Sequence, residues 1–450
     1  MTDTPLNSGK LLRNKVSRKA QGVFKLNSRR PSLIDVLEAS NQDRLPELVP
    51  IRHARMSESP FTFYRGMASM MAQDLSHLPY TNVMVQAIGD CHLMNFGGFA
   101  TPERTLIFDV NDFDETLPAS WEWDLKRLAT SFVLAARDIQ MKAIDAREMA
   151  WILSKSYREN MILFSQMNTL DLWYMKFDVE ALKENAKNAE VKQFLSDAIL
   201  KANKNTNQKT FYKITQNVLG KFSIADQLPL VYHPFDIHKA HEAILGFLDQ
   251  YAQTLQPDRR WLFQQFEVMD VALKVVGVGS VGTRCYVALL MNKKNDPLFL
   301  QIKEARASVL EAYTVAGIYS HNGQRVVEGQ RLVQAASDIF LGWSSSPTGR
   351  HYYFRQLRDK KIAPDPAQFD KTLLTAYARL CGRTLARAHA KTGNASIIAG
   401  YMGKGEMLDE SISRFAVAYA NQTEKDFETF KKAIRSGRLA CSPDPPSMKE

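Results

Sequence analysis

Several features that would assign a chain to a special class of protein are scarce or absent in this sequence. Its 450 residues include only four cysteines, which lie far apart and form no Cys-x-x-Cys pair: Cys91, Cys285, Cys381 and Cys441. A disulfide framework or a zinc cage is therefore not expected, and a reducing cytoplasm fits the cysteine content. No apolar run approaches the roughly 18 to 20 residues that span a bilayer, and the first residues lack the apolar core of a secretory signal.

The rest of the composition is ordinary for a globular protein large enough for two or more cores. Hydrophobic residues make up 45% of the chain and charged residues 24%, both close to the average. The net charge of +10 is unevenly distributed, because residues 1–30 contain eight basic residues and one acidic residue. We expect residues 1–34 to form a flexible basic leader. The alternative is that this leader contacts an anionic partner such as nucleic acid or anionic lipid.

Hydrophobic periodicity predicts an α+β fold with a larger, mainly helical lobe and a small antiparallel β-sheet lobe. Residues 35–255 are mostly helical in pattern and are interrupted by apolar strands at 81–88 and 105–110. Residues 256–362 alternate as strands, and residues 363–450 return to helix. We expect the last segment to complete the helical lobe.

Within the small β-rich lobe, the pattern after the first strands predicts one helix and two further strands. The helix is expected from Ser308 to about Ile318, and the strands within 326–343 and 350–361. A Ser/Pro/Gly turn at 344–349 would join these two strands.

A glycine-rich stretch, Gly277-Val278-Gly279-Ser280-Val281-Gly282, lies in the small lobe. Its GxGxxG spacing indicates a dinucleotide site only when a helix follows. Here the next residues alternate as a strand, so we expect a strand–turn–strand hairpin whose backbone amides cover phosphates. A glycine hairpin with a purely structural role is the alternative.

Lys303 ends the strand that follows this hairpin, which is where a kinase-type lysine binds the α- and β-phosphates. Glu311, on the expected helix, is the candidate ion-pair partner of its ammonium group. The alternative is that the two residues form an ordinary surface pair, which would contribute little to stability.

A second group of polar residues follows the two strands of the helical lobe. Asp90 and Asn95 have the D-x-x-x-x-N spacing of a catalytic loop, in which the carboxylate accepts a hydroxyl proton and the amide oxygen ligates Mg²⁺. Asp109, Asp112 and Asp114 follow, and a carboxylate among them would complete the metal site. The alternative is a polar turn in which Asp90 and Asn95 cap backbone amides.

The triplet Asp90-Cys91-His92 also matches the first ligand pair of dimetal phosphoesterases. Such a site needs further histidine and asparagine ligands, and the sequence contains no Gly-Asn-His. His233, His238 and His241 occur together, but among helices and a proline loop, where we expect surface or packing roles.

Three of these segments resemble the motifs of aminoglycoside phosphotransferases and choline-kinase-like enzymes. GDCHLMN resembles their GDxHxxN loop, VNDFDET resembles their strand-end Asp-Phe-Asp motif, and WDLKRLA resembles the Asp-Leu-Ala helix start that follows. From about Arg52 to Phe430 the chain is more specifically similar to a bacterial uncharacterised family, domain-of-unknown-function family 2252. SPFTFYRG, GDCHLMNFG, FDVNDFDET and VGVGSVGTRCYVALL carry this similarity.

The kinase-like resemblance implies a role for each matching residue. Asp90 would be the catalytic carboxylate and Asn95 a metal ligand. Asp112 would be the second metal ligand by its Asp-Phe context, with Asp109 and Asp114 as competitors. The nucleotide would be bound by Gly277, Gly279, Ser280, Gly282 and Lys303, with Glu311 supporting the lysine.

The order of the two segments is the reverse of that in the enzymes they resemble, because the catalytic loop precedes the glycine turn. A circular permutation of a kinase-like fold accounts for this order, since chain termini often lie close together. The sequence thus predicts an ATP- and Mg²⁺-dependent phosphotransferase. The short stretch between Asp114 and Trp121 favours a small-molecule acceptor over a protein. The alternatives are a non-catalytic nucleotide-binding regulator and a dimetal phosphoesterase.

Overall fold

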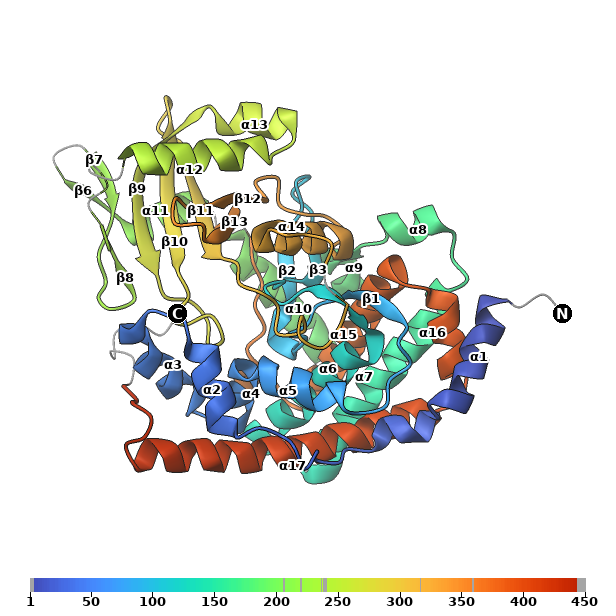
Figure 1. Ribbon diagram of the computed structural model, residues 1–450. Helices are drawn as coiled ribbons and strands as arrows, with labels where there is room; N and C mark the ends of the chain where they lie inside the picture. The colour runs from blue at the N-terminus through green and yellow to red at the C-terminus, as the bar shows by residue number, and fades with distance from the viewer. Residues whose placement is uncertain are drawn as a thin grey trace.

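The computed structural model describes residues 4–204, 207–218, 221–235, 237, 241–315, 317–357 and 360–442. The fold is α+β: long helices form one part of the molecule, and a six-stranded antiparallel sheet forms another (Figure 1). A search of the described helices for one with the length and apolarity to cross a membrane found none.

The basic N-terminal segment is folded onto the helical part, so the expectation of a flexible leader is wrong. Helix α1 (Pro5–Lys15) and the short helix η1 (Arg18–Gly22) lie along α16 (Ala395–Met402) and α17 (Met407–Arg435) (Figure 1). Arg13 Nε donates to the Tyr401 carbonyl at 2.9 Å, and Arg18 donates to the Met402 carbonyl at 2.9 Å. These arginines bind carbonyls at a helix C-terminus, where positive charge is favoured.

Four α-helices lie between Ser32 and Leu78, where the sequence predicts mostly helix from residue 35 onward. They are α2 (Leu33–Asn41), α3 (Val49–Met56), α4 (Pro60–Gly66) and α5 (Ala68–Ser76), with a short helix η2 (Pro46–Leu48) before α3. A capping box between Ser59 and Thr62 begins α4, because each side chain bonds the other residue's backbone amide.

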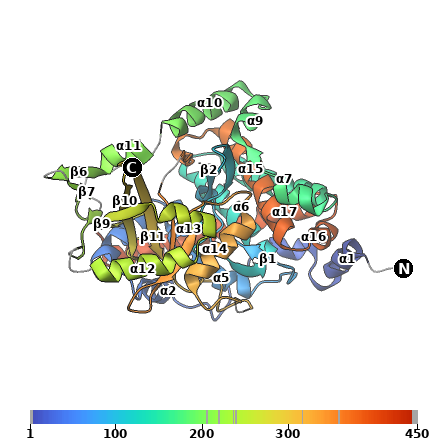
Figure 2. The same cartoon turned by 90° about the horizontal axis from the view of Figure 1, so that it is seen from above.

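The centre of the helical part is α6 (Trp121–Asp138), which is buried along almost its whole length. It packs against α7 (Ala143–Phe164) and α17, and α15 (Lys371–Thr392) runs along α7. A Cβ at Gly382 would clash with the Leu153 carbonyl, so α15 and α7 approach closely only because this position is glycine. Figure 2 shows these helices beside the strands that carry the polar loops.

Short strands and helices complete this part. They are β1 (Met84–Ala87), η3 (Leu93–Asn95), β2 (Phe96–Ala100), β3 (Leu106–Val110), β4 (Leu117–Ser120), α8 (Thr169–Tyr174), β5 (Phe177–Asp178), α9 (Val179–Glu184), α10 (Ala189–Asn203) and η4 (Pro366–Gln368). Strand β1 pairs antiparallel with β4, and β2 pairs antiparallel with β3. The two strands predicted at 81–88 and 105–110 are thereby confirmed as β1 and β3.

The six-stranded sheet has the order β12-β13-β11-β10-β9-β8, with antiparallel pairing throughout. Its strands are β8 (Val231–Tyr232), β9 (Phe266–Lys274), β10 (Cys285–Asn292), β11 (Pro297–Glu304), β12 (Gly342–Ser345) and β13 (His351–Gln356). Helices α12 (His241–Gln253) and α13 (Pro257–Phe263) lie against one face, where Tyr251 stacks on Phe354 at 4.0 Å. Helix α11 (Asn207–Ile214) and the β6–β7 hairpin (Thr215–Val218 and Lys221–Ile224) cover the other through Phe211 and Phe299.

Two predicted elements between β11 and β13 are wrong. Residues 308–315 form turns instead of a helix, because Ser308 and Val309 bond to Glu115 and Thr314 bonds to the Pro118 carbonyl. These bonds join distant segments of the chain, so tertiary contacts outweigh the local helical pattern. The helix occurs later, as α14 (Asn322–Val333), in a valine-rich stretch predicted as strand. Tertiary packing of its buried face overrides the strand propensity of valine.

Candidate functional site

The loop that carries Asp90 is held by a buried aspartate of α6. The Asp124 carboxylate accepts hydrogen bonds from the backbone amides of Ile88 at 2.6 Å and Gly89 at 3.0 Å. Gly89 has a φ of +83°, and a Cβ there would clash with the Glu115 carbonyl, so the turn requires glycine. His389 Nε2, on α15, lies 3.2 Å from Asp124 Oδ2. These contacts fix the loop's backbone from within the core.

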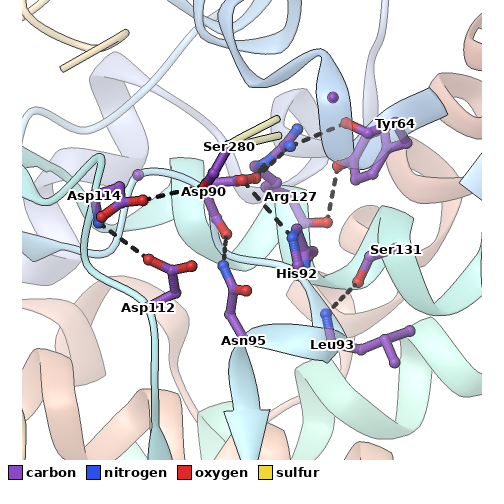
Figure 3. Close-up of polar contacts among 12 residues, drawn as sticks. Tyr64, Asp90, His92, Leu93, Asn95, Asp112, Asp114, Arg127, Ser131 and Ser280 are labelled. Carbon is purple, nitrogen blue, oxygen red and sulfur yellow. Dashed lines mark hydrogen bonds and ion pairs between the residues drawn. The ribbon is translucent and has the colours of Figure 1, made fainter. Parts of the chain in front are cut away.

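The Asp90 carboxylate lies against a buried arginine (Figure 3). Arg127 Nε and Nη2 donate to Asp90 Oδ1 at 2.8 and 2.5 Å. Burial nevertheless raises the pKa of the Asp90 carboxyl more than the attraction of Arg127 lowers it. His92 Nε2 lies 3.7 Å from Asp90 Oδ2, and burial lowers the pKa of His92 well below its usual range, so its imidazole is neutral at pH 7.

Asn95 is brought beside Asp90 by the short helix η3. Its amide nitrogen donates to the Asp90 carbonyl at 2.6 Å, which leaves the amide oxygen as a potential metal ligand (Figure 3). Asn111, just after β3, donates its backbone amide to the Asn95 carbonyl at 2.8 Å. The catalytic-type loop and the acidic strand end therefore lie side by side, as the spacing of the motifs predicts.

The three aspartates after β3 have different environments. Asp109 is buried, and both its carboxylate oxygens lie 2.7 Å from Arg387 Nη2, with a further bond from the Ala335 amide at 2.9 Å. Its oxygens are thus committed to the core. The Asp112 and Asp114 side chains are 36% and 28% exposed, which leaves them accessible to a ligand. Of the three, Asp112 and Asp114 are the ones exposed enough to reach a bound ion.

Lys303 of β11 reaches across to this acidic strand end. Its ammonium nitrogen lies 2.6 Å from Asp114 Oδ2 and 3.8 Å from Asp112 Oδ1. Tyr353, the neighbour of Lys303 on β13, donates to Asp114 Oδ1 at 2.6 Å. Burial alone would lower the pKa of Lys303, but the two carboxylates raise it well above its usual range, so the lysine is charged.

Glu311 does not have the position expected for it. It is exposed in a turn and not on a helix, while the ion pairs that Lys303 makes within the described residues go to Asp112 and Asp114. The expected pairing of Lys303 with Glu311 is therefore wrong. The prediction fails because hydrogen bonds from Ser308 and Val309 to Glu115 hold this segment in turns, so Glu311 is not on a helix.

The glycine-rich stretch joins β9 to β10, which confirms the predicted hairpin. Gly277 and Gly282 have φ values of +66° and +86°, the left-handed region that favours glycine. Side chains of the N-terminal segment hold the turn: Arg55 of α3 donates to the Gly277 carbonyl, and Arg44, in the loop after α2, donates to the Val281 carbonyl, both at 2.5 Å. Ser280 Oγ lies 3.5 Å from Asp114 Oδ2, so the turn reaches the acidic strand end (Figure 3).

The donor set fits magnesium better than a protein-built metal cage. In the described part of the chain, no group of three or more His, Cys, Asp or Glu side chains is arranged to hold a metal ion. Asn95 with Asp112 or Asp114 offers two oxygen ligands, and Mg²⁺ is commonly held by one or two protein oxygens together with phosphates and waters. His233 is paired with Asp226 and Asp270, His238 lies outside the described residues, and His241 is the first residue of α12.

Several residues of the site were not selected from the sequence. Asp124 and Arg127 lie in WDLKRLA, where polar side chains fall on an otherwise buried helix; this was the available signal. Tyr353 and His389 had no such signal, because their roles depend on partners far away in the chain.

A protein-family model matches residues 44–433, and its description is "Uncharacterized protein conserved in bacteria (DUF2252)". The chain belongs to this family. The matched span of the DUF2252 family contains every site residue from Asp90 to Lys303. Neither the curated proteins nor the solved structures include a match.

Proposed function

We propose that this DUF2252 protein is an ATP- and Mg²⁺-dependent phosphotransferase of the kinase-like type, acting on a hydroxyl group of a small molecule. The observation that carries the proposal is the 2.6 Å contact between Lys303 and Asp114, with Ser280 at 3.5 Å from the same carboxylate. These contacts bring a glycine turn, a lysine and an acidic strand end together in one site. The same three parts recur in phosphoryl-transfer enzymes.

The topology of the sheet supports a kinase-like arrangement. The glycine turn joins the first two strands of the β9-β10-β11 meander, the lysine lies on the third, and α14 follows before β12 and β13. In protein kinases the glycine-rich loop covers the phosphates and the lysine is likewise on the third strand. A circular permutation of a two-lobed kinase-like fold explains why the catalytic-type loop comes first in this chain. Helix α15, late in the chain, supports that loop through His389.

In the proposed reaction each residue has a distinct role. Asp90 orients the acceptor hydroxyl and accepts its proton, while Lys303 binds the α- and β-phosphates. Asn95 and Asp112 would hold the magnesium ion, with Asp114 as a further ligand. When bound, the ion neutralises charge on the phosphates. Lys303 and Arg355 lower the pKa of Asp112 despite its burial, which keeps that carboxylate ionised.

The environment of the acidic strand end favours a small acceptor. Residues Leu117–Ser120 form β4 and pair with β1, and Trp121 begins α6 directly afterwards. The chain after Asp114 therefore has no long free loop on which a peptide substrate could dock.

A second candidate function is a non-catalytic nucleotide-binding regulator. The observation that favours it is the pairing of Asp90 with Arg127, since both bonds from the guanidinium group fall on Asp90 Oδ1 and occupy one of the two oxygens that could accept a proton.

Nucleotide binding and turnover together test the proposal. MgATP at 100 times its dissociation constant should stabilise the wild-type protein by about 2.7 kcal/mol. Lys303→Met should remove most of this stabilisation, whereas Asp90→Asn should retain it and abolish ADP formation over a panel of small alcohols and amino sugars. Stabilisation without turnover in the wild type would favour the regulator. Absence of any MgATP effect on the wild type would contradict both functions.

A further inference from the structure

Arg65, in the last turn of α4, is a cation without a partner. Within the described residues its guanidinium group makes no hydrogen bond or ion pair, and its Nε is a buried atom that lacks a partner. The other arginines around the site make hydrogen bonds: Arg127 bonds Asp90 and the Tyr64 carbonyl, and Arg355 bonds Gln301 and the Asn111 carbonyl. Arg325 and Arg387 also have an unpartnered buried Nε, but each donates through Nη to carbonyl or carboxylate oxygens. The Arg65 side chain is partly exposed, but its Nε is withdrawn from water without a partner. Such a donor is costly, and a ligand could satisfy it.

The backbone at Arg65 lies between the two halves of the site. On one side, the preceding residue Tyr64 exchanges two hydrogen bonds with Arg127, the arginine that binds Asp90, at 2.9 and 3.1 Å (Figure 3). On the other side, a Cβ at Gly279 would lie 3.3 Å from the Arg65 carbonyl, so the glycine turn passes directly over this residue. Arg65 is therefore held where the catalytic-type loop and the glycine turn meet.

The carboxylates that act on Arg65 are those of Asp90, Asp112 and Glu58, and it is hydrogen-bonded to none of them. Arg65 and Arg127 act on Asp90, while Lys303 and Arg355 act on Asp112. Arg127 and Lys303 are directly paired with carboxylates, but Arg65 is attracted to Asp90 and Asp112 without contacting them. The nearest ring, Phe61, lies 5.9 Å from its guanidinium carbon and supplies an apolar surface, not a hydrogen-bond acceptor.

We propose that Arg65 binds an oxyanion of a substrate, through phosphate or carboxylate oxygens, at the junction of the glycine turn and the Asp90 loop. Arginine suits this role because its planar group donates two parallel hydrogen bonds to such an anion. The inference rests on the proposed phosphotransfer function. The anion has two possible sources, the terminal phosphate of the nucleotide or an anionic group on the acceptor.

Binding measurements on two Arg65 variants test the proposal. Arg65→Gln removes the charge. Arg65→Lys keeps the charge but loses the planar group that donates two parallel hydrogen bonds. Arg383→Gln is the matched control, because Arg383 also has an unpartnered buried Nε and lies over an aromatic ring, Phe177, but belongs to α15 outside the site. Circular dichroism and the thermal midpoint verify that each variant folds.

The first arm compares MgATP with MgADP by calorimetry. If the anion is the terminal phosphate, Arg65→Gln should weaken MgATP binding at least tenfold and leave MgADP binding within about twofold, with Arg65→Lys in between. The second arm titrates inorganic phosphate into protein saturated with a non-hydrolysable MgATP analogue. If the anion belongs to the acceptor, phosphate should bind the wild type and Arg383→Gln at least tenfold more tightly than Arg65→Gln.

A third arm separates failure of this inference from failure of the proposed function. Inorganic phosphate and pyrophosphate are titrated into the nucleotide-free protein. If the wild type binds no MgATP but binds these anions more tightly than Arg65→Gln does, the anion site is supported and the phosphotransfer function is contradicted. If a folded Arg65→Gln variant matches the wild type in all three arms, Arg65 is not an anion-binding residue.

Discussion

The two sides of the candidate site are built in different ways. The carboxylate side is part of the core: Asp124 bonds two backbone amides of the Asp90 loop, and Asp109 pairs with Arg387, both in buried surroundings. The glycine side is a turn between two strands. Arg44 and Arg55 bond its carbonyls, the Leu45 amide bonds the Gly282 carbonyl, and Val278 and Val281 pack among residues of the N-terminal helices. The difference teaches that Asp90 is positioned from within the core of the helical part, whereas the glycine turn is positioned by its contacts with the N-terminal segment.

This comparison also separates residues of one type that the sequence presents as equals. Asp109, Asp112 and Asp114 lie within six residues of one another. Only Asp109 is sealed in the core by an arginine of a late helix, so its loss should affect folding, whereas loss of Asp112 should affect ligand binding.

The largest effect is expected from breaking the buried pair of Asp109. Asp109→Asn should lower the free energy of unfolding by about 3 kcal/mol, because Arg387 would then be a buried charge without its partner. Asp112→Asn should change stability by less than about 1 kcal/mol and abolish the Mg²⁺ dependence of ATP binding. Urea denaturation and calorimetry measure the two quantities. If Asp109→Asn left stability intact, the structural role assigned to Asp109 would be wrong.

A somewhat smaller loss is expected at the support of the Asp90 loop. Asp124→Ala should destabilise the protein by about 2–3 kcal/mol, because the amides of Ile88 and Gly89 would remain buried without an acceptor. Turnover should be lost as well, since Asp90 would no longer be held in place. Asp197→Ala, at an exposed position of α10, is the control and should change stability by about 0.5 kcal/mol or less.

A stabilising change is expected at Lys126, on the same central helix. Burial lowers the pKa of this lysine from 10.5 to about 8, although Glu122 raises it in part. Because the unfolded chain holds the proton more tightly, the cost of burial is fully present below about pH 8 and decreases as pH rises toward 10.5. Lys126→Met should therefore stabilise the protein by roughly 1–2 kcal/mol at pH 7.

The pH dependence checks this assignment. The advantage of Lys126→Met over the wild type should shrink between pH 8 and 10.5 in denaturation experiments. An advantage that stays constant over this range would show that charge burial is not its cause.

The smallest effect on stability is expected at the glycine turn. Gly277 has a φ of +66° and open space around it, so Gly277→Ala should cost only about 1 kcal/mol of backbone strain. The loss of MgATP binding free energy in this variant should exceed its loss of stability, because the turn is the proposed cover of the phosphates. Gly246→Ala, in α12 with open space at a helical position, is the control and should stabilise slightly. Unchanged MgATP affinity in Gly277→Ala would contradict the role of the turn.

Periodicity and turn chemistry predicted much of the site before its geometry was known. Strict alternation after Gly282 indicated a strand, which placed the glycines in a hairpin and Lys303 on the next strand, as the structure has them. The spacing of Asp90 and Asn95 indicated a loop after a buried strand, which is also observed. These features depend on residues close together in the chain, so local pattern was sufficient.

The errors occurred where distant contacts outweigh local propensity. The valine-rich start of the 326–343 stretch favours a strand, but its buried face packs as α14, with Arg325 bonded to the Asp114 and Thr116 carbonyls. The basic N-terminal residues looked solvated in sequence, but their arginines bind carbonyls of a helix near residue 400. No window of the sequence contains both partners of such a contact.

By itself, the sequence determined the α+β composition, the glycine hairpin, the lysine-bearing strand and the loop with Asp90 and Asn95. Only the tertiary structure decided which aspartate faces Lys303, which is committed to Arg387, and that Arg65 lies unpaired between the two halves. The physical reason is that hydrophobic periodicity and turn geometry are local properties. Ion pairing and burial depend on segments that meet only in the folded protein, here 189 positions apart for Lys303 and Asp114 and 278 for Arg387 and Asp109.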